Sequence, residues 1–259
     1  MQITFQKYQG AGNDFIMLDN RAGQYSSIQE SLIVHLCDRN RGIGADGLIM
    51  IEASNKVHFK MIYFNSDGKE STMCGNGARC AVAFAYTLNL VQSKCVFEAI
   101  DGLHKAEILS DKLVQISMNN VSQIETHGDA LIMNTGSPHY VVLKNDISTL
   151  EIIKQAAKIR YSEAYKSKGI NVNYIAINES GELQIRTYER GVENETLACG
   201  TGAVAAAIAT DFWGLDCQKY PVTINALGGI LKVGFDKTEH GYEKIVLSGS
   251  AEYVFSGEI

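Results

Sequence analysis

The pattern of hydrophobic and polar positions along this chain predicts strands in most segments and helices in a few. The segments 57–65 and 182–190 alternate or cluster β-branched and aromatic residues, which is typical of strands. Each continues through a short polar turn into an alanine-rich run, at 78–89 and 203–213, that predicts a helix. A more polar helix is predicted over 148–160.

The two alanine-rich runs have no polar face, because the letters CAVAFAY and AVAAAIA are apolar or small on every side of a helix. A helix of this kind has to be covered on all sides. Strands flank both runs in the sequence, so we expect each half of the chain to wrap a sheet around one central helix. This pattern predicts an α+β fold.

The chain contains an internal repeat. Cys74 lies in ESTMCGNGAR and Cys199 in NETLACGTGA, and the two cysteines are 199 − 74 = 125 residues apart. Two further pairs of segments recur in the same order, GNDFIML with GSPHYVV at an offset of 124 and RGIGADGLIMI with KGINVNYIAIN at an offset of 127. A period of this length indicates duplicated domains. We expect two pseudo-symmetric domains, 1–117 and 118–247, with a final strand at about 248–259 that returns to the first.

Composition and charge exclude several classes of protein. The 259 residues are 46% hydrophobic and 20% charged, and 23 Lys and Arg against 29 Asp and Glu give a net charge of −6. Proteins that bind nucleic acids usually carry a basic excess, so we expect no nucleic acid partner. No apolar run approaches the roughly 18 residues that a membrane span needs, and the first residues lack the pattern of a signal peptide. We therefore expect a cytoplasmic protein without a membrane partner.

The cysteines do not follow the spacing of a metal site, since no C-x2-C pair occurs among the six, and we expect no bound metal. Cys37, Cys80 and Cys95 lie in or beside apolar segments and are expected to be buried. Cys217 lies in a polar segment that indicates no role. The remaining two cysteines stand in the repeated C-G-x-G-A motif.

Each C-G-x-G-A motif predicts a cysteine just before the first turn of a helix, where the backbone N–H groups have no helical partner. This end of a helix attracts anions such as a carboxylate and favours a thiolate over a thiol. A single motif of this kind is also compatible with a phosphate site, a redox thiol or a tight turn. Two matched motifs favour two thiols that face one bound carboxylate in a cleft between the domains.

Two thiols on opposite faces of one carbon can remove a proton from one face and return a proton to the other, which inverts a stereocentre. An amino-acid α-carbon suits this reaction, because the two helix starts can hold its carboxylate while the carbanion forms. The sequence contains no glycine-rich dinucleotide motif and no P-loop, and the reaction needs no cofactor.

Six segments, GAGNDF, RGIGADG, FNSDGKESTMCGNGAR, NTGSPHYV, INVNY and YERG…ETLACGTGA, together resemble the diaminopimelate epimerase family of cofactor-independent amino-acid racemases. The resemblance extends in order from Gly10 to about Ala207. It implies two α/β halves around a cleft. It also implies interconversion of LL- and meso-2,6-diaminopimelate, on the route to lysine and peptidoglycan precursor. We also expect a homodimer.

The resemblance implies roles for individual residues. It makes Cys74 and Cys199 the acid–base pair, and it implies that His139 and Glu189 tune the two thiols. A guanidinium such as that of Arg190 suits a distal carboxylate, because it can bind it bidentately. The positions that the resemblance assigns to substrate binding are Asn13, Gly47, Asn65, Gly75, Asn76, Ser137, Asn171, Glu189, Arg190, Gly200 and Thr201. Of these, the residues that directly follow the two cysteines supply the helix-start donors.

Two of these positions depart from the family pattern. Gly47 stands where many members carry a side-chain amide, and Ser137 stands where an asparagine is usual. Two alternatives remain open: a family relative that racemises another amino acid, such as histidine, and a thiol–disulfide or anion-binding protein. Without the resemblance, Asn65 is compatible with a turn residue and His139 with a loop histidine.

Overall fold

The computed structural model describes residues 2–71, 73–215 and 220–259. By its internal contacts the chain divides into two compact units, one made of residues 1–116 and 249–259 and the other of residues 117–248. No helix in the described part of the chain is long and apolar enough to cross a membrane. Cys217 lies outside the described residues.

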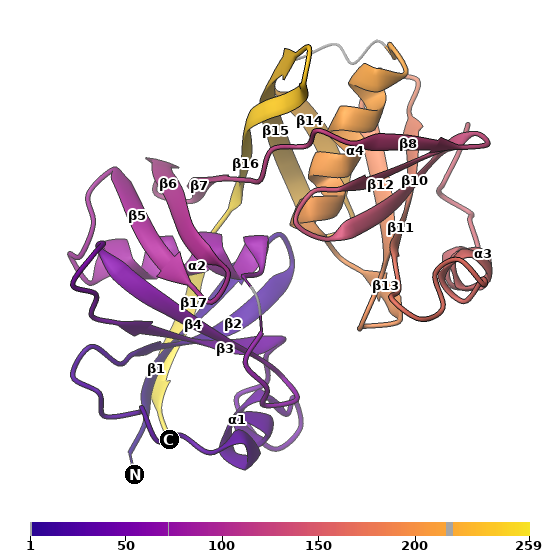
Figure 1. Ribbon diagram of the computed structural model, residues 1–259. Coiled ribbons are helices and arrows are strands. Elements are labelled where there is room, and N and C mark those ends of the chain that lie inside the picture. The colour runs from indigo at the N-terminus through magenta and orange to yellow at the C-terminus, as the bar shows by residue number, and fades with distance from the viewer. Residues whose placement is uncertain (1, 72, 216–219) are drawn as a thin grey trace. The chain divides into compact units, whose positions relative to one another are not determined.

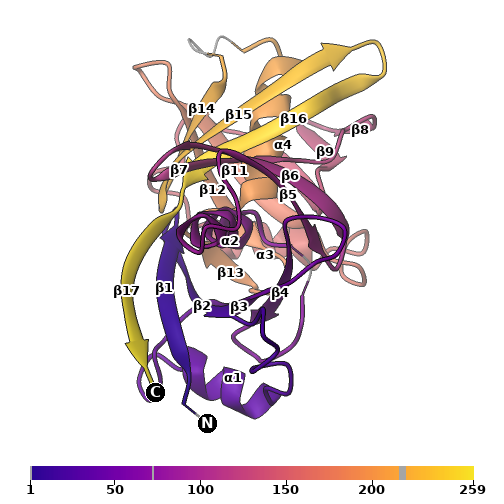
Figure 2. The same cartoon turned by 90° about the vertical axis from the view of Figure 1, so that its left-hand side faces the viewer.

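The first unit is a mixed sheet with two helices. Its strands pair in the order β17–β1–β2–β3–β4–β5–β6–β7, in which β2 with β3 and β4 with β5 are parallel and the other pairs are antiparallel. Figure 2 shows the C-terminal strand β17 beside β1. The elements are β1 (Thr4–Gly10), β2 (Asn13–Asp19), α1 (Glu30–Cys37), β3 (Gly47–Glu52), β4 (Phe59–Asn65), α2 (Gly75–Thr87), β5 (Lys94–Ala99), β6 (Gly102–Ser110), β7 (Leu113–Ser117) and β17 (Glu252–Glu258).

The second unit has the same succession of parallel and antiparallel pairs. Its strands pair in the order β8–β9–β10–β11–β12–β14–β15, in which β10 with β11 and β12 with β14 are parallel. The elements are β8 (Ile124–His127), β9 (Ala130–Asn134), β10 (Pro138–Leu143), α3 (Ile152–Arg160), β11 (Asn171–Ile177), β12 (Leu183–Glu189), β13 (Asn194–Thr196), α4 (Gly200–Phe212), β14 (Val222–Ala226), β15 (Gly229–Thr238) and β16 (Gly241–Ser250). The predicted α+β fold with two duplicated halves is confirmed.

Helices α2 and α4 are the central helices of the two units (Figure 1). Helix α2 packs against β1, β2, β3, β4 and β6, and helix α4 packs against β9, β10, β11, β12, β14 and β15. Each residue from Ala203 to Ala209 is completely buried. The small alanine side chains allow strands to approach the helix from every side, as the absence of a polar face predicts.

The motifs place the helix starts better than the alanine-rich runs do. Helices α2 and α4 begin at Gly75 and Gly200, directly after the cysteines as the C-G-x-G-A motif predicts, and three residues before the alanine-rich runs at 78 and 203. Helix α3 begins at Ile152 rather than at 148. Ser148 is held in a turn instead, since its backbone N–H and its hydroxyl donate to the carboxylate of Asp146 at 2.8 and 2.9 Å.

Three cysteines are buried as the sequence predicts. Cys37 ends α1, Cys80 lies within α2 and Cys95 lies in β5. Burial raises the pKa of their thiols to about 11, 12 and 11. These cysteines are therefore protonated at neutral pH and act as small apolar side chains.

Candidate functional site

The two repeated cysteines occupy equivalent positions at the starts of the central helices. Cys74 is the N-cap of α2 and Cys199 is the N-cap of α4, both with extended backbone dihedral angles, and both side chains are half-buried. Neither helix has an acidic residue in its first turn. The positive ends of the two helix dipoles therefore meet no carboxylate from their own first turns, which suits an anionic ligand and a thiolate.

In the first unit, the strand pairing brings three candidate residues to one edge of the sheet. Asn13 begins β2, Gly47 begins β3 and Asn65 ends β4, with Gly47 paired to Asn65 in register. The Asn13 side chain connects this edge to helix α2, because Asn76 Nδ2 donates to Asn13 Oδ1 at 2.6 Å. Asn76 in turn accepts a hydrogen bond of 2.9 Å from the guanidinium of Arg79, which is completely buried.

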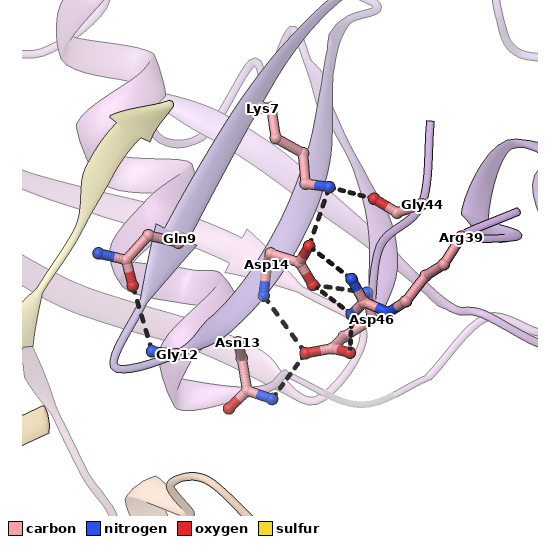
Figure 3. A network of polar contacts seen from close by, with 8 residues as sticks. All are labelled: Lys7, Gln9, Gly12, Asn13, Asp14, Arg39, Gly44 and Asp46. Atoms are coloured by element: carbon pink, nitrogen blue, oxygen red, sulfur yellow. Dashed lines mark hydrogen bonds and ion pairs between the residues drawn. The ribbon is translucent and has the colours of Figure 1, made fainter. Parts of the chain in front are cut away.

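Asp46 orients Asn13 from the other side and was not among the residues predicted from the sequence. Asn13 Nδ2 donates to Asp46 Oδ2 at 2.8 Å. Arg39 forms ion pairs of 2.7 Å with both Asp46 and Asp14, and Lys7 lies 2.9 Å from Asp14 (Figure 3). Burial alone would raise the pKa of Asp14, but hydrogen bonds and charges from Arg39 and Lys7 outweigh it and lower that pKa below 3.8. This cluster fixes the amide of Asn13.

Gly47 can contribute only its backbone. A Cβ atom at this position would lie 2.5 Å from the carbonyl oxygen of Phe64 and 2.7 Å from Cε2 of Tyr63. The ring of Tyr63 therefore fills the space into which a side chain at position 47 would extend. The ring of Tyr63, from the neighbouring strand, thus occupies the space where the resemblance leads us to expect a side-chain amide.

Asn65 lies at a turn, as its sequence context suggested. Its backbone N–H donates to the carbonyl of Lys69 at 3.0 Å, and its carbonyl accepts from Gly68 at 2.9 Å. The side chain is half-buried, and within the described residues it has no hydrogen-bond partner.

In the second unit, Ser137, Asn171 and Arg190 lie together. Asn171 Nδ2 donates to Ser137 Oγ at 2.8 Å and to the Pro138 carbonyl at 3.0 Å, and Asn171 Oδ1 accepts from the backbone of Arg190 at 2.8 Å. The guanidinium of Arg190 is exposed and donates to Ser137 Oγ at 3.4 Å. Since Ser137 accepts two hydrogen bonds here, its own hydroxyl hydrogen can point at a ligand together with the guanidinium.

His139 is a buried strand residue, and the alternative interpretation as a loop histidine is wrong. It lies in β10 with no exposed surface, and its Nε2 is 2.9 Å from the hydroxyl oxygen of Thr201. The same hydroxyl oxygen is 3.4 Å from the sulfur of Cys199. Burial, assisted by the charge of Arg190, lowers the pKa of His139 to about 3, so the ring is neutral at physiological pH.

Asn173 and Thr187 lie on the other side of His139, and neither was among the residues predicted from the sequence. Asn173 Nδ2 donates to His139 Nδ1 at 2.9 Å, and Thr187 Oγ1 donates to Asn173 Oδ1 at 3.0 Å. One signal was available, because Asp46 and Asn173 stand 173 − 46 = 127 residues apart, which is an offset of the repeat. Glu189, the last residue of β12, is half-buried at the same end of the strand as Arg190.

Comparisons with known proteins agree on one family. The family model described as diaminopimelate epimerase matches residues 5–124 and 131–254. A diaminopimelate epimerase from Flavobacterium psychrophilum is 48% identical over 257 residues, which cover 99% of this chain and 100% of the relative. A diaminopimelate epimerase from Hydrogenobaculum sp. is 38% identical, with 99% of this chain and 98% of the relative covered.

The fold also occurs in more distant proteins. A phenazine biosynthesis protein of the PhzF family from Bacillus anthracis superposes with a TM-score of 0.73 at 12% identity, and the match covers 100% of this chain and 99% of that one. At this low identity the likeness shows the fold alone.

Proposed function

This chain belongs to the diaminopimelate epimerase family, and we propose that it interconverts LL-2,6-diaminopimelate and meso-2,6-diaminopimelate. The observation that supports this activity best is the pair of matched helix starts, each with a half-buried cysteine at its N-cap. Relatives with this name match the chain along almost its full length, so a racemase specific for another amino acid is not favoured. The reaction belongs to the synthesis of lysine and of peptidoglycan precursor.

In the proposed reaction, one of Cys74 and Cys199 begins as a thiolate and the other as a thiol. The thiolate removes the proton from the α-carbon, and the electron pair of the broken C–H bond stays with the substrate as a carbanion. The thiol then donates its proton to the opposite face, which forms the C–H bond of the inverted centre. Both protons are accounted for, and after one turnover the two cysteines have exchanged protonation states.

The backbone N–H groups of Gly75, Asn76, Gly200 and Thr201 are the proposed donors to the reacting carboxylate. Negative charge moves onto this carboxylate when the α-proton leaves. Donors that are already aligned at a helix start stabilise that charge more than they stabilise the substrate, which lowers the barrier. The α-proton is much less acidic than a thiol, so this stabilisation is essential to the proposed activity.

The second end of the substrate needs groups of both charges, because it carries a carboxylate and an ammonium. We assign the carboxylate to Arg190 and Ser137, whose donors lie together, and we assign Asn171 the role of holding both in place. Glu189 and the amides of Asn13 and Asn65 are suited to the ammonium groups. Gly47 is restricted to a backbone contact.

We further propose that His139 and Glu189 tune the thiols, and that the enzyme is a cytoplasmic homodimer. The contact of His139 with Thr201 supports the first role, whereas the resemblance to the family supports the assembly. Size-exclusion chromatography with light scattering should give twice the chain mass of 28.3 kDa. A mass of one chain at micromolar concentration would contradict the dimer.

The test of the proposed activity is turnover in D2O. Purified full-length protein should convert LL-diaminopimelate into the meso form, and the inverted α-carbon should carry deuterium by NMR spectroscopy. Lysine lacks the distal carboxylate and should be a very poor substrate, since unpaired polar groups in the site cost about 1–3 kcal/mol each. The substrate assignment is wrong if lysine, histidine, glutamate or proline matches diaminopimelate in kcat/KM.

A further inference from the structure

A continuous chain of hydrogen bonds in the second unit ends at the sulfur of Cys199. It connects Thr187 to Asn173, Asn173 to His139, His139 to Thr201 and Thr201 to Cys199, with distances of 3.0, 2.9, 2.9 and 3.4 Å. The first three of these residues have at most 3% of their surface exposed. The hydrogen bonds from Thr187 to His139 are therefore shielded from water, whereas Thr201 and Cys199 are half-buried.

The chemistry of its members fixes the direction of the hydrogen atoms. The side-chain nitrogen of Asn173 can only donate, so Nδ1 of His139 accepts and the proton of the neutral ring lies on Nε2. Nε2–H then donates to the oxygen of Thr201. The Thr201 hydroxyl hydrogen remains for the sulfur, which is within range of a hydrogen bond to sulfur.

The Tyr140 carbonyl settles the orientation of the Asn173 amide, because a carbonyl can only accept and lies 3.4 Å from Asn173 Nδ2. The Thr187 hydroxyl, which can donate or accept, then donates to Asn173 Oδ1. An amide turned the other way would place its NH2 group against the hydroxyl and its oxygen against the carbonyl. The orientation in the structure thus gives each polar atom of Asn173 a partner of the right kind.

From this geometry we infer that Asn173 is a positioning residue for Cys199: it fixes the tautomer of His139 so that the Thr201 hydroxyl donates to the sulfur and stabilises the thiolate. A hydrogen bond to a charged acceptor is stronger than one to a neutral acceptor, so the thiolate gains more than the thiol. The role of this thiolate in catalysis rests on the proposed function. The hydrogen bonds that lead to Cys199 do not depend on that function.

The second glycine of the CGTGA motif gives independent support. A Cβ atom at Gly202 would lie 2.6 Å from Asn173 Oδ1 and 3.3 Å from both Thr187 Oγ1 and Cys199 Cβ. Gly202 has no left-handed backbone conformation that would require glycine. The absence of a side chain here lets the first turn of α4 lie directly on Asn173, which brings the cysteine and the buried amide together.

The charged groups near this end of helix α4 are few. Glu189 and Arg190 lie at the end of β12, and Arg186 on the same strand is paired with Glu195 at 2.6 Å. Lys237 on β15 pairs with Asp211 at the opposite end of α4. The substitutions below change none of these charges, so a change in the reactivity of Cys199 reports on the hydrogen bonds.

The first test is the tautomer of His139. Long-range ¹H–¹⁵N spectra of the full-length protein should show a neutral ring protonated on Nε2 between pH 5 and 9. Asn173→Leu has nearly the same shape but no donor, and the ring should then lose its preference for Nε2. A wild-type ring protonated on Nδ1 would overturn the inference.

The second test is the rate at which iodoacetamide alkylates Cys199, measured by peptide mass spectrometry as a function of pH. Thr201→Val removes the hydroxyl and should slow alkylation roughly tenfold at pH 7, which corresponds to a thiol pKa about one unit higher. Asn173→Leu should slow it in the same direction. The Cys74 peptide of the same sample is the internal reference.

Thr210→Val is the matched control. Thr210 is buried in the same helix, and its hydroxyl donates to the Ala206 carbonyl at 2.7 Å, away from the hydrogen-bond chain. Its alkylation profile should equal that of the wild type. An unchanged profile in Thr201→Val, or an equal shift in Thr210→Val, would overturn the inference.

If Asn173→Leu does not fold, Thr201→Val and the milder Thr187→Val decide the question by the same measurement. Neither test uses turnover. A protein that shows the expected alkylation shift but does not epimerise diaminopimelate would retain the hydrogen-bond chain and refute the proposed function alone.

Discussion

Asp46 and Asn173 occupy matching positions of the two halves, 173 − 46 = 127 residues apart, but they hold their partners by hydrogen bonds of opposite direction. The Asp46 carboxylate accepts from Asn13 at 2.8 Å, whereas the Asn173 amide donates to His139 at 2.9 Å. In both halves that partner then binds the residue two positions after the cysteine. Each half therefore contains a similar series of hydrogen bonds, but the direction of donation is reversed between the two halves.

This reversal gives the two cysteines different surroundings on the same backbone motif. In the first half, the hydrogen bonds run from the buried Arg79 through Asn76 and Asn13 to the Asp46 carboxylate. In the second half, they run toward the sulfur of Cys199. Two-base epimerisation uses one thiolate and one thiol at a time, and unequal surroundings are compatible with that requirement.

Removal of either thiol should abolish inversion. Cys74→Ala and Cys199→Ala each delete one of the two proposed proton carriers, and the loss of a positioned acid or base typically costs about 10²–10⁴ in rate. Chiral chromatography of the diaminopimelate product measures the effect. Cys37→Ala and Cys95→Ala remove buried cysteines with raised thiol pKa values and should retain turnover. Wild-type kcat in either active-site variant would contradict the two-base mechanism.

Arg190→Met should mainly impair recognition of the distal carboxylate. Loss of a hydrogen bond to a charged group costs about 1.5–3 kcal/mol, so we expect kcat/KM for LL-diaminopimelate to fall roughly 10- to 100-fold. Arg190→Lys keeps the charge without the planar fork and should recover only part of the loss. Arg21→Met, which removes an exposed arginine paired with Asp19, is the control. An equal loss in Arg21→Met would show that the effect is not specific to the site.

Gly47→Ala should destabilise the first unit. The added methyl would lie 2.5 Å from the Phe64 carbonyl oxygen and 2.7 Å from the Tyr63 ring, and overpacking of this kind costs about 1–3 kcal/mol. Urea denaturation measures the change. In Gly234→Ala, the methyl would meet a methyl group of Val246 at 3.1 Å, and this flexible side chain can move, so the cost should be smaller. Equal stability of the wild type and Gly47→Ala would show that the backbone adjusts freely.

Features that depend on local sequence could be predicted, and features that depend on strand pairing could not. The central helices and the cysteines at their starts follow from an apolar pattern and a repeated motif. Helix α1 was not predicted, because eight residues are too few to show a clear helical period. The start of α3 was placed too early, since a side-chain turn between Asp146 and Ser148 competes with the helix.

In the candidate site, too, the residues placed by strand pairing could not be predicted from the sequence. Asn13, Asn171 and Arg190 could be named from motifs, but the residues that orient them could not. Asn173 reaches His139 only because β10 and β11 are parallel, with His139 paired to Asn171 in register. Likewise, the sequence shows a glycine at position 47, but only the packing shows that the Tyr63 ring fills its side-chain space.

The buried His139 should make the protein less stable in mild acid. Its pKa falls from the ordinary 6.5 to about 3 in the folded state because burial disfavours the charged ring. Between these values the unfolded chain binds one more proton than the folded chain, so the free energy of unfolding falls as the pH is lowered. This one group contributes a slope of about 1.4 kcal/mol per pH unit in that window.

His139→Gln removes the titrating ring, and its stability should depend less on pH between 6 and 4 than that of the wild type, whatever its stability at pH 7. Urea denaturation at each pH measures the two slopes, and the carboxylates contribute to both chains alike. His127→Gln, at an exposed position in β8, is the control for the exchange of histidine for glutamine, and an equal change of slope in both variants would show that the effect is not specific to His139. Parallel curves for wild type and His139→Gln would mean that the folded protein protonates this ring near its ordinary pKa. The neutral ring whose Nδ1 accepts from Asn173 would then be lost in mild acid, since a protonated ring carries a hydrogen on both nitrogens.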